Sequence, residues 1–316
     1  MQVLVKSRDG TDPKYGCPPD KRPIHEHINK SIVNVDKPAG PTSHQVTTWV
    51  RDIFKLSKAG HSGTLDPKVT GVLPVGLGES TKILQALLKS SKSYVCAMKL
   101  QGDASNNQVK KTLGYFQDMI YQRPPLKSAV KRQLRKRTIY RNTYLERVDD
   151  IVLYETECEA GTYIRKLCHD IGLILGVGAH MVRLRRTKAG PYTEDTLTTL
   201  HDLKDAYVAF EEGDETKLRK ILQPMESAVS DLPKFWVKDS TVDAICHGAT
   251  LKAPGVSKLT DNVKPGTLTA MFTLKDELLG LAESVMDAKQ IMETEKGEVA
   301  LPCRLTLATD TYPRSW

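Results

Sequence analysis

The spacing of apolar residues predicts a chain in which helices and strands are mixed. In the stretch TSHQVTTWVRDIFKL (42–56), a helix cap at Thr42 or Ser43 precedes apolar positions spaced as on one helix face. The stretch GTYIRKLCHDIGLIL (161–175) has the same spacing, and SYVCAMKL (93–100) is a predicted strand. The inward-facing positions are Val46, Val50, Ile53 and Phe54 in the first helix, and Ile164, Leu167, Cys168 and Ile171 in the second. This order predicts an α+β fold.

The pattern changes near Lys234, where we predict a domain boundary. Before it, KLRKILQPMESAVSDL (217–232) is predicted as one helix, and beyond it short strand-like stretches are broken by Gly and Pro. Residues 1–30 lack periodicity and contain four prolines, which indicates an extended arm that is ordered only if it is tied down. The predicted division is therefore an arm (1–30) packed on the C-terminal module, a main domain (31–233) and a small β-rich domain (234–316).

Composition narrows the class of protein. The chain has 316 residues, of which 40% are apolar and 27% charged, as in globular proteins, and its net charge of +8 favours a polyanionic partner. The six cysteines are scattered without a C-x-x-C pair, so neither a metal site nor a disulfide framework is expected. No apolar run is long enough to span a bilayer, and the charged, proline-broken N-terminal stretch does not resemble a signal peptide. We therefore expect an intracellular protein.

A basic stretch, KSAVKRQLRKRTIYR (127–141), contains seven Lys or Arg residues and no acid. Most charge runs are solvated surface, but ordinary surfaces intersperse the two signs, whereas uncompensated cations repel one another unless a polyanion is present. The stretch therefore predicts a mobile loop that binds nucleic acid. The residues expected to make these contacts are Lys131, Arg132, Arg135 and Arg137.

A second stretch, MVRLRRTKAGPY (181–192), alternates apolar and basic residues as a strand does. Val182 and Leu184 would share one face, with Arg183 and Arg185 on the other. The alternatives are an edge strand protected by positive charge and a strand whose Arg185 contacts RNA, and the stretch alone does not separate them.

Asp66 lies in GHSGTLDPKVTG (60–71), a run of small and turn-forming residues. An isolated aspartate in such a loop is usually a turn former or a helix cap. Five further segments change that interpretation: VDKPAGPTS, KSYVCAMKL, EAGTYIRKLCHDIG, VGAHMVRLRRTKAGPY and, towards the C-terminus, AICHGATLKAPGV.

Together with the Asp66 segment, the first four of these segments resemble, in their order along the chain, the motifs of the bacterial tRNA pseudouridine-55 synthase and dyskerin class. The segment YQRPPLKSAVKRQLRKR and the C-terminal segment resemble the archaeal and eukaryotic H/ACA branch, which carries a PUA RNA-binding domain. One departure is Gln101, where the family pattern has histidine. The absence of long Lys-rich tails points to an archaeal-type protein. The resemblance implies a mixed-sheet catalytic domain followed by a small β-rich PUA domain.

The resemblance also implies roles for single residues. Asp66 matches the catalytic aspartate, Tyr94 the tyrosine that stacks on the target uracil, and Arg165 the arginine paired with the aspartate. Leu184 matches a leucine that packs the pocket, and His61 a histidine in the motif before the acid.

Lys37 and Pro38 match a motif that supports the active-site loop. Gly248 marks a turn where backbone could approach RNA closely. Several alternatives remain open at this stage. Arg165 could be a surface arginine, Tyr94 a core strand residue or a general base, and Gly248 an ordinary turn glycine.

The implied reaction is the isomerisation of uridine to pseudouridine, in which the base leaves ribose carbon 1′ and reattaches through its own carbon 5. This chemistry needs no cofactor or metal, and it requires a charged carboxylate in a pocket from which water is largely excluded. Asp66 could attack the sugar, attack the ring or assist proton abstraction. The implied partners are an H/ACA guide RNA, a target rRNA or tRNA, and small proteins of that particle, without a membrane.

The implied location is the cytoplasm in archaea, or the nucleolus if the chain is eukaryotic. Three alternatives to the guided enzyme are a stand-alone tRNA pseudouridine synthase, a catalytically silent RNA-binding scaffold and a nucleoside hydrolase.

Overall fold

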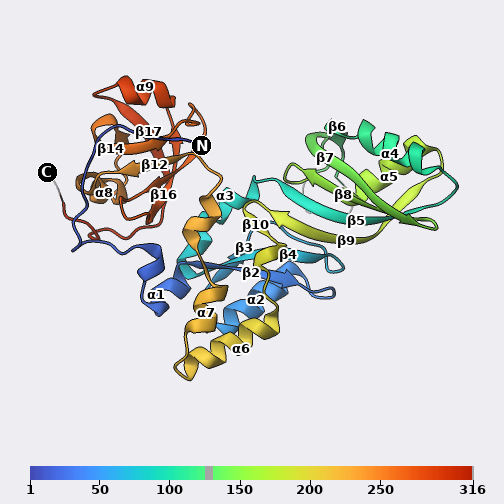
Figure 1. Cartoon of the computed structure of the whole chain (residues 1–316), viewed down its shortest axis with the longest axis horizontal. Helices are drawn as coiled ribbons and strands as arrows, with labels where there is room; N and C mark the ends of the chain where they lie inside the picture. Colours follow the sequence, from blue (N-terminus) through green and yellow to red (C-terminus); the bar gives the residue numbers. More distant parts are fainter. Residues whose placement is uncertain (125–130, 315–316) are drawn as a thin grey trace.

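The computed structural model describes residues 1–124 and 131–314, which contain two sheets (Figure 1). In this part of the chain the larger sheet has ten strands, in the order β11-β2-β4-β9-β5-β8-β7-β6, with β10 on β9 and β3 on β4. These strands are β2 (Ser31–Lys37), β3 (Ala59–His61), β4 (Thr70–Leu77), β5 (Lys92–Leu100), β6 (Asp118–Gln122), β7 (Arg135–Val148), β8 (Ile151–Cys158), β9 (Ala179–Ala189), β10 (Tyr192–Thr193) and β11 (Gln223–Pro224). The pair β4–β9 is parallel, whereas neighbours such as β2–β4 and β5–β9 are antiparallel. The mixed sheet of the predicted α+β fold is thus confirmed.

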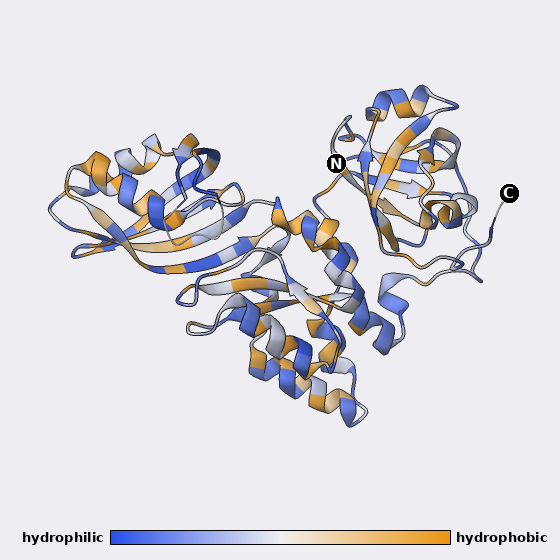
Figure 2. Cartoon of the chain, turned by 180° about the vertical axis from the view of Figure 1, so that it is seen from behind, coloured by the Kyte–Doolittle hydropathy of each residue, from blue (hydrophilic) through white to orange (hydrophobic). Residues whose placement is uncertain are grey.

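Two groups of helices cover this sheet. Helix α2 (Ser43–Ile53) packs with α6 (Leu200–Glu211) and α7 (Thr216–Ile221) against β2 and β4, while α4 (Asn106–Tyr115) and α5 (Ile164–Leu175) cover β5 and β8. Helix α2 begins with a capping box between Thr42 and Gln45, which settles Thr42 as the cap. The helix ribbons in Figure 2 carry both hydrophobic and hydrophilic residues, as helices with one buried face require. None of the helices in residues 1–124 and 131–314 has the length and apolar character needed to cross a bilayer.

The predicted helix over residues 217–232 is interrupted. It consists of α7, the short strand β11 and the 3-10 helix η4 (Met225–Val229), because Pro224 has no N–H to donate and cannot continue a helix. The segment before β5 is likewise divided, into the 3-10 helix η2 (Gly78–Ile83) and α3 (Leu84–Leu88). Both segments contribute residues to an apolar cluster that also contains residues of the smaller sheet.

The smaller sheet has seven strands within the described residues, in the order β1-β14-β12-β15-β16-β17-β13. Its strands are β1 (Val3–Val5), β12 (Lys234–Val237), β13 (Leu251–Lys252), β14 (Val256–Thr260), β15 (Leu268–Phe272), β16 (Leu278–Ser284) and β17 (Glu298–Leu305). Two helices that the sequence did not predict, α8 (Asp239–Cys246) and α9 (Ala288–Glu293), complete it. Because β1 pairs with β14, the N-terminal segment is an edge strand of this sheet.

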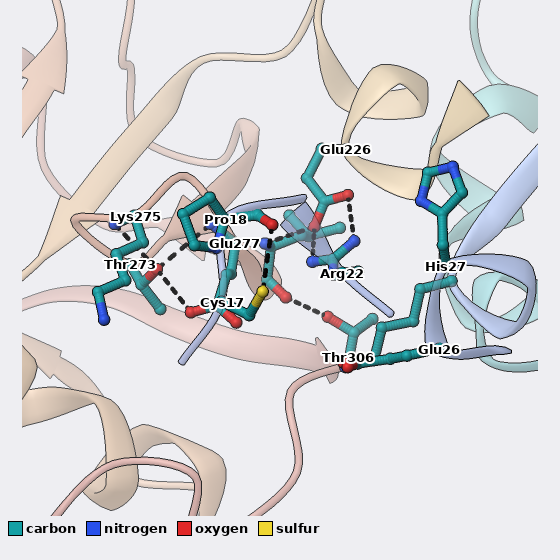
Figure 3. A network of polar contacts seen from close by, with 12 residues as sticks. Cys17, Pro18, Arg22, Glu26, His27, Glu226, Thr273, Lys275, Glu277 and Thr306 are labelled. Carbon is teal, nitrogen blue, oxygen red and sulfur yellow. Dashed lines mark hydrogen bonds and ion pairs between the residues drawn. The ribbon is translucent and has the colours of Figure 1, made fainter. Parts of the chain in front are cut away.

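The two sheets are joined at a buried arginine. Arg22, from the N-terminal segment, is 1% exposed and donates two hydrogen bonds to Glu226 of η4, at 3.0 and 2.7 Å. The same carboxylate, which faces Arg22 in Figure 3, also accepts a 3.0 Å hydrogen bond from the backbone N–H of Leu278 at the start of β16. An apolar cluster with residues from both sheets, among them Ile32 and Phe272, lies at the same junction. We call the contacts of Arg22, Glu226 and Leu278 the interdomain joint.

Candidate active site

Asp66 lies in a loop between β3 and β4 that is fixed from below by Lys37. The Lys37 side chain is fully buried, and its Nζ donates hydrogen bonds to the carbonyls of Pro38 (2.9 Å), Pro67 (3.1 Å) and Val69 (2.9 Å). Two of these carbonyls flank Asp66 on its C-terminal side. The lysine at the end of β2 therefore holds the backbone of the loop in place.

Ser43 fixes the other side of the same loop. Its hydroxyl accepts a hydrogen bond from the backbone N–H of Leu65 (2.8 Å) and donates one to the Leu65 carbonyl (3.1 Å). Ser43 is the first residue of α2 and is fully buried. With Thr42 serving as the cap, Ser43 is free to hold the residue that precedes Asp66.

Asp66 and Arg165 form an ion pair between Oδ2 and Nη2, although 99 positions separate them in the sequence. Arg165 lies on the first turn of α5, which rests on β9 and β5 and brings the guanidinium to the loop. The side chains are 56% and 58% exposed, so the expected exclusion of water is wrong for the chain by itself. The carboxylate is open to a large substrate.

Tyr94 and Leu184 lie close to each other on neighbouring strands. Tyr94 pairs in register with Arg186, and Leu184 with Cys96, where β5 runs beside β9. Both side chains are half-buried at the edge of the core beneath α5. Burial raises the pKa of the Tyr94 hydroxyl, so it stays protonated at neutral pH, which disfavours the general-base alternative.

The predicted alternation along β9 is broken by a bulge. Met98 pairs with Met181 but the preceding Ala97 pairs with Arg183, so Val182 is an extra residue. Val182 is exposed, and Met181 rather than Val182 packs with Leu184 against the core. The prediction that Val182 and Leu184 share one face is therefore wrong.

Arg186 is a buried residue of the site that the sequence analysis did not single out. It is 1% exposed; its Nε donates to the Val72 carbonyl at 2.7 Å, and its Nη atoms reach the Gly63 carbonyl at 3.4 Å. A Cβ at Gly71 would lie 2.2 Å from the Arg186 carbonyl oxygen, so only glycine fits beside it. The available signal was its place directly after Arg185, because neighbouring strand residues face opposite ways.

Burial and the positive charge of Arg186 act on two neighbouring bases. His61 is the last residue of β3. Burial lowers the pKa of its imidazole, and repulsion from Arg186 and then from His44 lowers it further, so His61 is neutral at pH 7. Burial, again assisted by Arg186, lowers the pKa of Lys92 to about 8. Lys92 is only 5% exposed and donates to the carbonyls of residues 87, 88 and 90. The loop and the strand of Tyr94 thus rest on buried cations.

The basic stretch is only partly a loop. Lys131 and Arg132 are exposed and precede β7, but Arg135 and Arg137 lie within β7, which corrects the prediction of a loop to residue 141. Arg137 is 18% exposed and faces Glu159 at 3.4 Å. Residues 127–130 of the stretch lie outside the described residues. The exposed cations of the predicted set are thus concentrated in its first half.

Arg185 is paired with two carboxylates, and Gly248 lies in the turn that follows α8. The Arg185 guanidinium donates to both oxygens of Asp36 (3.0 and 3.1 Å) and to Glu194 (2.6 Å). This arrangement favours a structural role for Arg185 over the predicted RNA contact. Gly248 has φ +93° two residues after α8 and is exposed, as a glycine that ends a helix often is.

The fixed loop, its exposed ion pair and the half-buried tyrosine and leucine fit the class that the motifs implied, the RNA pseudouridine synthases. Comparison with known proteins gives the family. Residues 51–164 match the N-terminal domain of TruB family pseudouridylate synthases, and residues 165–230 match the tRNA pseudouridylate synthase B C-terminal domain. A DKCLD domain matches residues 1–47 and a PUA domain residues 233–304. The chain belongs to the TruB family and is an RNA pseudouridine synthase, an isomerase.

Relatives and solved structures agree over nearly the whole chain. The "Probable tRNA pseudouridine synthase B" of Methanosarcina mazei is 55% identical, covering 99% of this chain and 93% of the relative. That of Methanopyrus kandleri is 50% identical, covering 100% and 94%. A chain in the crystal structure of a Cbf5-Nop10-Gar1 complex superposes with a TM-score of 0.96 at 49% identity, covering 99% of this chain and 96% of that one. A chain from an H/ACA RNP bound to a substrate RNA containing 2′-deoxyuridine gives 0.94 at 47%, covering 100% and 97%.

Proposed function

We propose that this chain is the catalytic subunit of a box H/ACA guide-RNA particle that converts uridine to pseudouridine in rRNA, with tRNA as a second substrate. The proposal is supported by its similarity, over 99% and 100% of its length, to chains from a Cbf5-Nop10-Gar1 complex and from an H/ACA RNP with substrate RNA. Small proteins of that particle would be its partners, and an archaeal cytoplasm its location.

The observation that carries the proposal is the exposed Asp66–Arg165 pair on a loop with fixed backbone. When a glycosidic bond breaks, a carboxylate stabilises or traps the oxocarbenium-like sugar. Arg165 pairs with that carboxylate and orients it with a planar, permanently charged group. Uracil then rotates, and its carbon 5 bonds to carbon 1′ of the sugar while the carboxylate is released. Carbon 5 loses its proton and ring nitrogen 1, freed from the sugar, takes one up.

Tyr94 and Leu184 would hold the base while its sugar bond is broken. A uridine must leave its stack to reach Asp66, and stacking on an aromatic ring returns about 1–3 kcal/mol per base. Because its hydroxyl is protonated, Tyr94 serves as a stacking surface and hydrogen-bond donor. His61 is neutral and lies at the entrance to the loop, where it would contact the extruded nucleotide without adding charge.

The other parts of the chain would hold the rest of the RNA. Residues 31–233 form the proposed catalytic domain and residues 234–316 the proposed PUA domain, with the arm (1–30) packed on the latter. Lys131, Arg132 and Arg135 would contact the phosphates of the substrate, and Gly248 would allow close approach of RNA to the backbone of the C-terminal module. The buried joint would keep these two RNA-binding regions at a fixed spacing.

A guided modification assay tests the proposal. Purified chain, guide RNA and the small particle proteins are incubated with a complementary target RNA, and pseudouridine is mapped by carbodiimide-blocked primer extension. We expect modification of the target uridine with a matched guide and none with a scrambled guide. Modification of an rRNA-like target without any guide would contradict the guided mechanism.

A second candidate, a stand-alone tRNA pseudouridine synthase, is favoured by the names of the Methanosarcina and Methanopyrus relatives. The same assay with unmodified tRNA and chain alone tests it. Product in tRNA without guide, together with guide dependence on rRNA, would establish both activities.

A further inference from the structure

A cavity lies beside the Asp66–Arg165 pair, with Arg165 in its wall. Its volume is about 510 Å³, within the roughly 300–1,000 Å³ of small-ligand sites. Its lining includes Tyr121, Arg123, Arg132, Arg165, Lys166 and His169. Asp66, Tyr94 and Leu184 do not line it, so Arg165 is the wall that it shares with the catalytic site. We call this cavity the flanking pocket.

The charge of the flanking pocket is positive. None of the described residues that line it is an acid. Two of its cations are matched, Arg165 by Asp66 and Lys166 by Asp170, which also lies 3.4 Å from His169. Arg123 and Arg132 have no ion pair within the part of the chain that the structure describes; Arg132 donates only to the Pro124 carbonyl, at 3.3 Å. Two exposed guanidinium groups beside a paired arginine suit a phosphate group.

The pocket also offers an aromatic surface. Tyr121, near the end of β6, is 54% exposed, and Nζ of Lys136 lies 5.8 Å from its ring centroid. An exposed ring among cations is the combination with which proteins bind single-stranded nucleic acid, because the ring stacks on a base while the cations hold the backbone. A free phosphate would use only the cations, so the ring favours a whole nucleotide.

We propose that the flanking pocket binds the nucleotide next to the target uridine, with Arg123 and Arg132 on its phosphate and Tyr121 on its base. The inference rests on the proposed function, since it assigns a further part of the same RNA. Arg165 then separates two adjacent nucleotides, one acted upon by Asp66 and one held. Holding the neighbour keeps the backbone in the extruded path that brings the target sugar to the carboxylate.

The test measures coupling between protein and RNA changes in the assembled guide particle. In an Asp66→Asn background, which allows binding to be measured without turnover, target RNAs carry one neutral methylphosphonate at each phosphate near the uridine. We expect Arg123→Met to weaken target binding about tenfold. At one phosphate beside the target, methylphosphonate and Arg123→Met together should weaken binding no more than either alone. Arg51→Met, at an arginine of α2 whose side chain is 40% exposed and pairs with Asp52, is the control and should couple to no position.

A parallel pair tests the base. Tyr121→Leu should weaken binding roughly tenfold with an intact neighbouring base and have no effect when that nucleotide is abasic. Penalties that add at every position, or unchanged affinity in both variants, would overturn the inference. Coupling of Tyr121 to an abasic target position would overturn it too, because the pocket would then hold the target. Pseudouridine formation by the wild-type particle is measured alongside: its absence refutes the proposed function, whereas product without coupling refutes only the flanking pocket.

Discussion

Two of the arginine–carboxylate pairs among the described residues lie in contrasting surroundings. Arg22 and Glu226, in the interdomain joint, have side chains 1% and 10% exposed. Arg165 and Asp66, in the proposed active site, have side chains 58% and 56% exposed. Exposed pairs contribute about 0–1 kcal/mol to stability, whereas removing one partner of a buried pair costs about 3–5 kcal/mol. The same kind of ion pair therefore joins the two sheets at one place and leaves an exposed carboxylate accessible at the other.

The buried cations near the two pairs also differ, in whether a carboxylate neutralises them. Burial acts to lower the pKa of Arg22, but its hydrogen bonds to Glu226 raise it above the ordinary value. Beneath the catalytic loop, burial lowers the pKa values of Lys37, Lys92 and Arg186, and none of these three has an ion pair among the described residues. Carbonyl oxygens are their partners there. The joint is electrostatically balanced, while the active site retains buried positive charge suited to an anionic substrate.

The largest expected effect separates chemistry from stability at the exposed pair. Asp66→Asn should reduce the single-turnover rate by at least about 10³-fold, because the amide cannot act as an anion towards the sugar. RNA affinity and the melting temperature should change little, since the pair is exposed. Quench-flow measurement of pseudouridine, with anisotropy and calorimetry on the same preparation, checks all three. Normal turnover by the variant would remove Asp66 from the mechanism.

The next effect breaks the buried pair. Glu226→Gln should lower the free energy of unfolding by about 3–5 kcal/mol, because Arg22 would remain buried without the carboxylate that pairs with it. Denaturant unfolding followed by tryptophan fluorescence measures it. The double variant Arg22→Met, Glu226→Leu should recover much of the loss, since no charge is left buried. Equal destabilisation by Asp66→Asn would erase the contrast between the two pairs.

The pH dependence of the unfolding free energy tests whether Lys92, unlike Arg22, is buried without a carboxylate partner. The pKa of Lys92 falls from 10.5 to about 8 on folding, so the folded chain releases this proton first as the pH rises. Its contribution to stability is therefore fully present above pH 10.5 and is lost as the pH falls to about 8. Between these limits, wild type should gain up to about 3 kcal/mol relative to Lys92→Met. If the difference in unfolding free energy between wild type and Lys92→Met stays constant from pH 7.5 to 10, Lys92 is not a buried, unpaired charge.

The extent of prediction from sequence differs between the same two regions. The helices with apolar faces, α2 and α5, were confirmed because each face follows from local spacing, and motif resemblance paired Asp66 with Arg165 across 99 positions. Arg186 was missed because its importance lies in what surrounds it, two carbonyls from distant segments, rather than in its neighbours in sequence.

The joint could not be predicted for a related reason. Arg22, Glu226 and Leu278 come from three parts of the chain without a shared pattern, and their contact depends on how the two sheets dock. Pro224, which breaks the predicted helix and starts the turn carrying Glu226, was visible in the sequence, but its effect was underestimated. Arg186 and the joint are thus both defined by contacts between segments that are distant in the sequence.

The smallest expected effect applies the comparison to the basic stretch, where one arginine is exposed and another is paired. Replacing Arg132, Arg135 and Arg137 together by alanine should weaken RNA binding and flatten its salt dependence, but the three should not contribute equally. Arg132 is exposed, so Arg132→Ala should reduce the log–log salt slope by about one unit. Arg137 is 18% exposed beside Glu159, so Arg137→Ala should leave the slope unchanged and lower stability instead. Titration of fluorescent target RNA from 50 to about 300 mM salt measures both slopes. Equal slope changes would mean that Arg137 leaves Glu159 to contact phosphate, and that burial in the free chain does not identify which cations bind RNA.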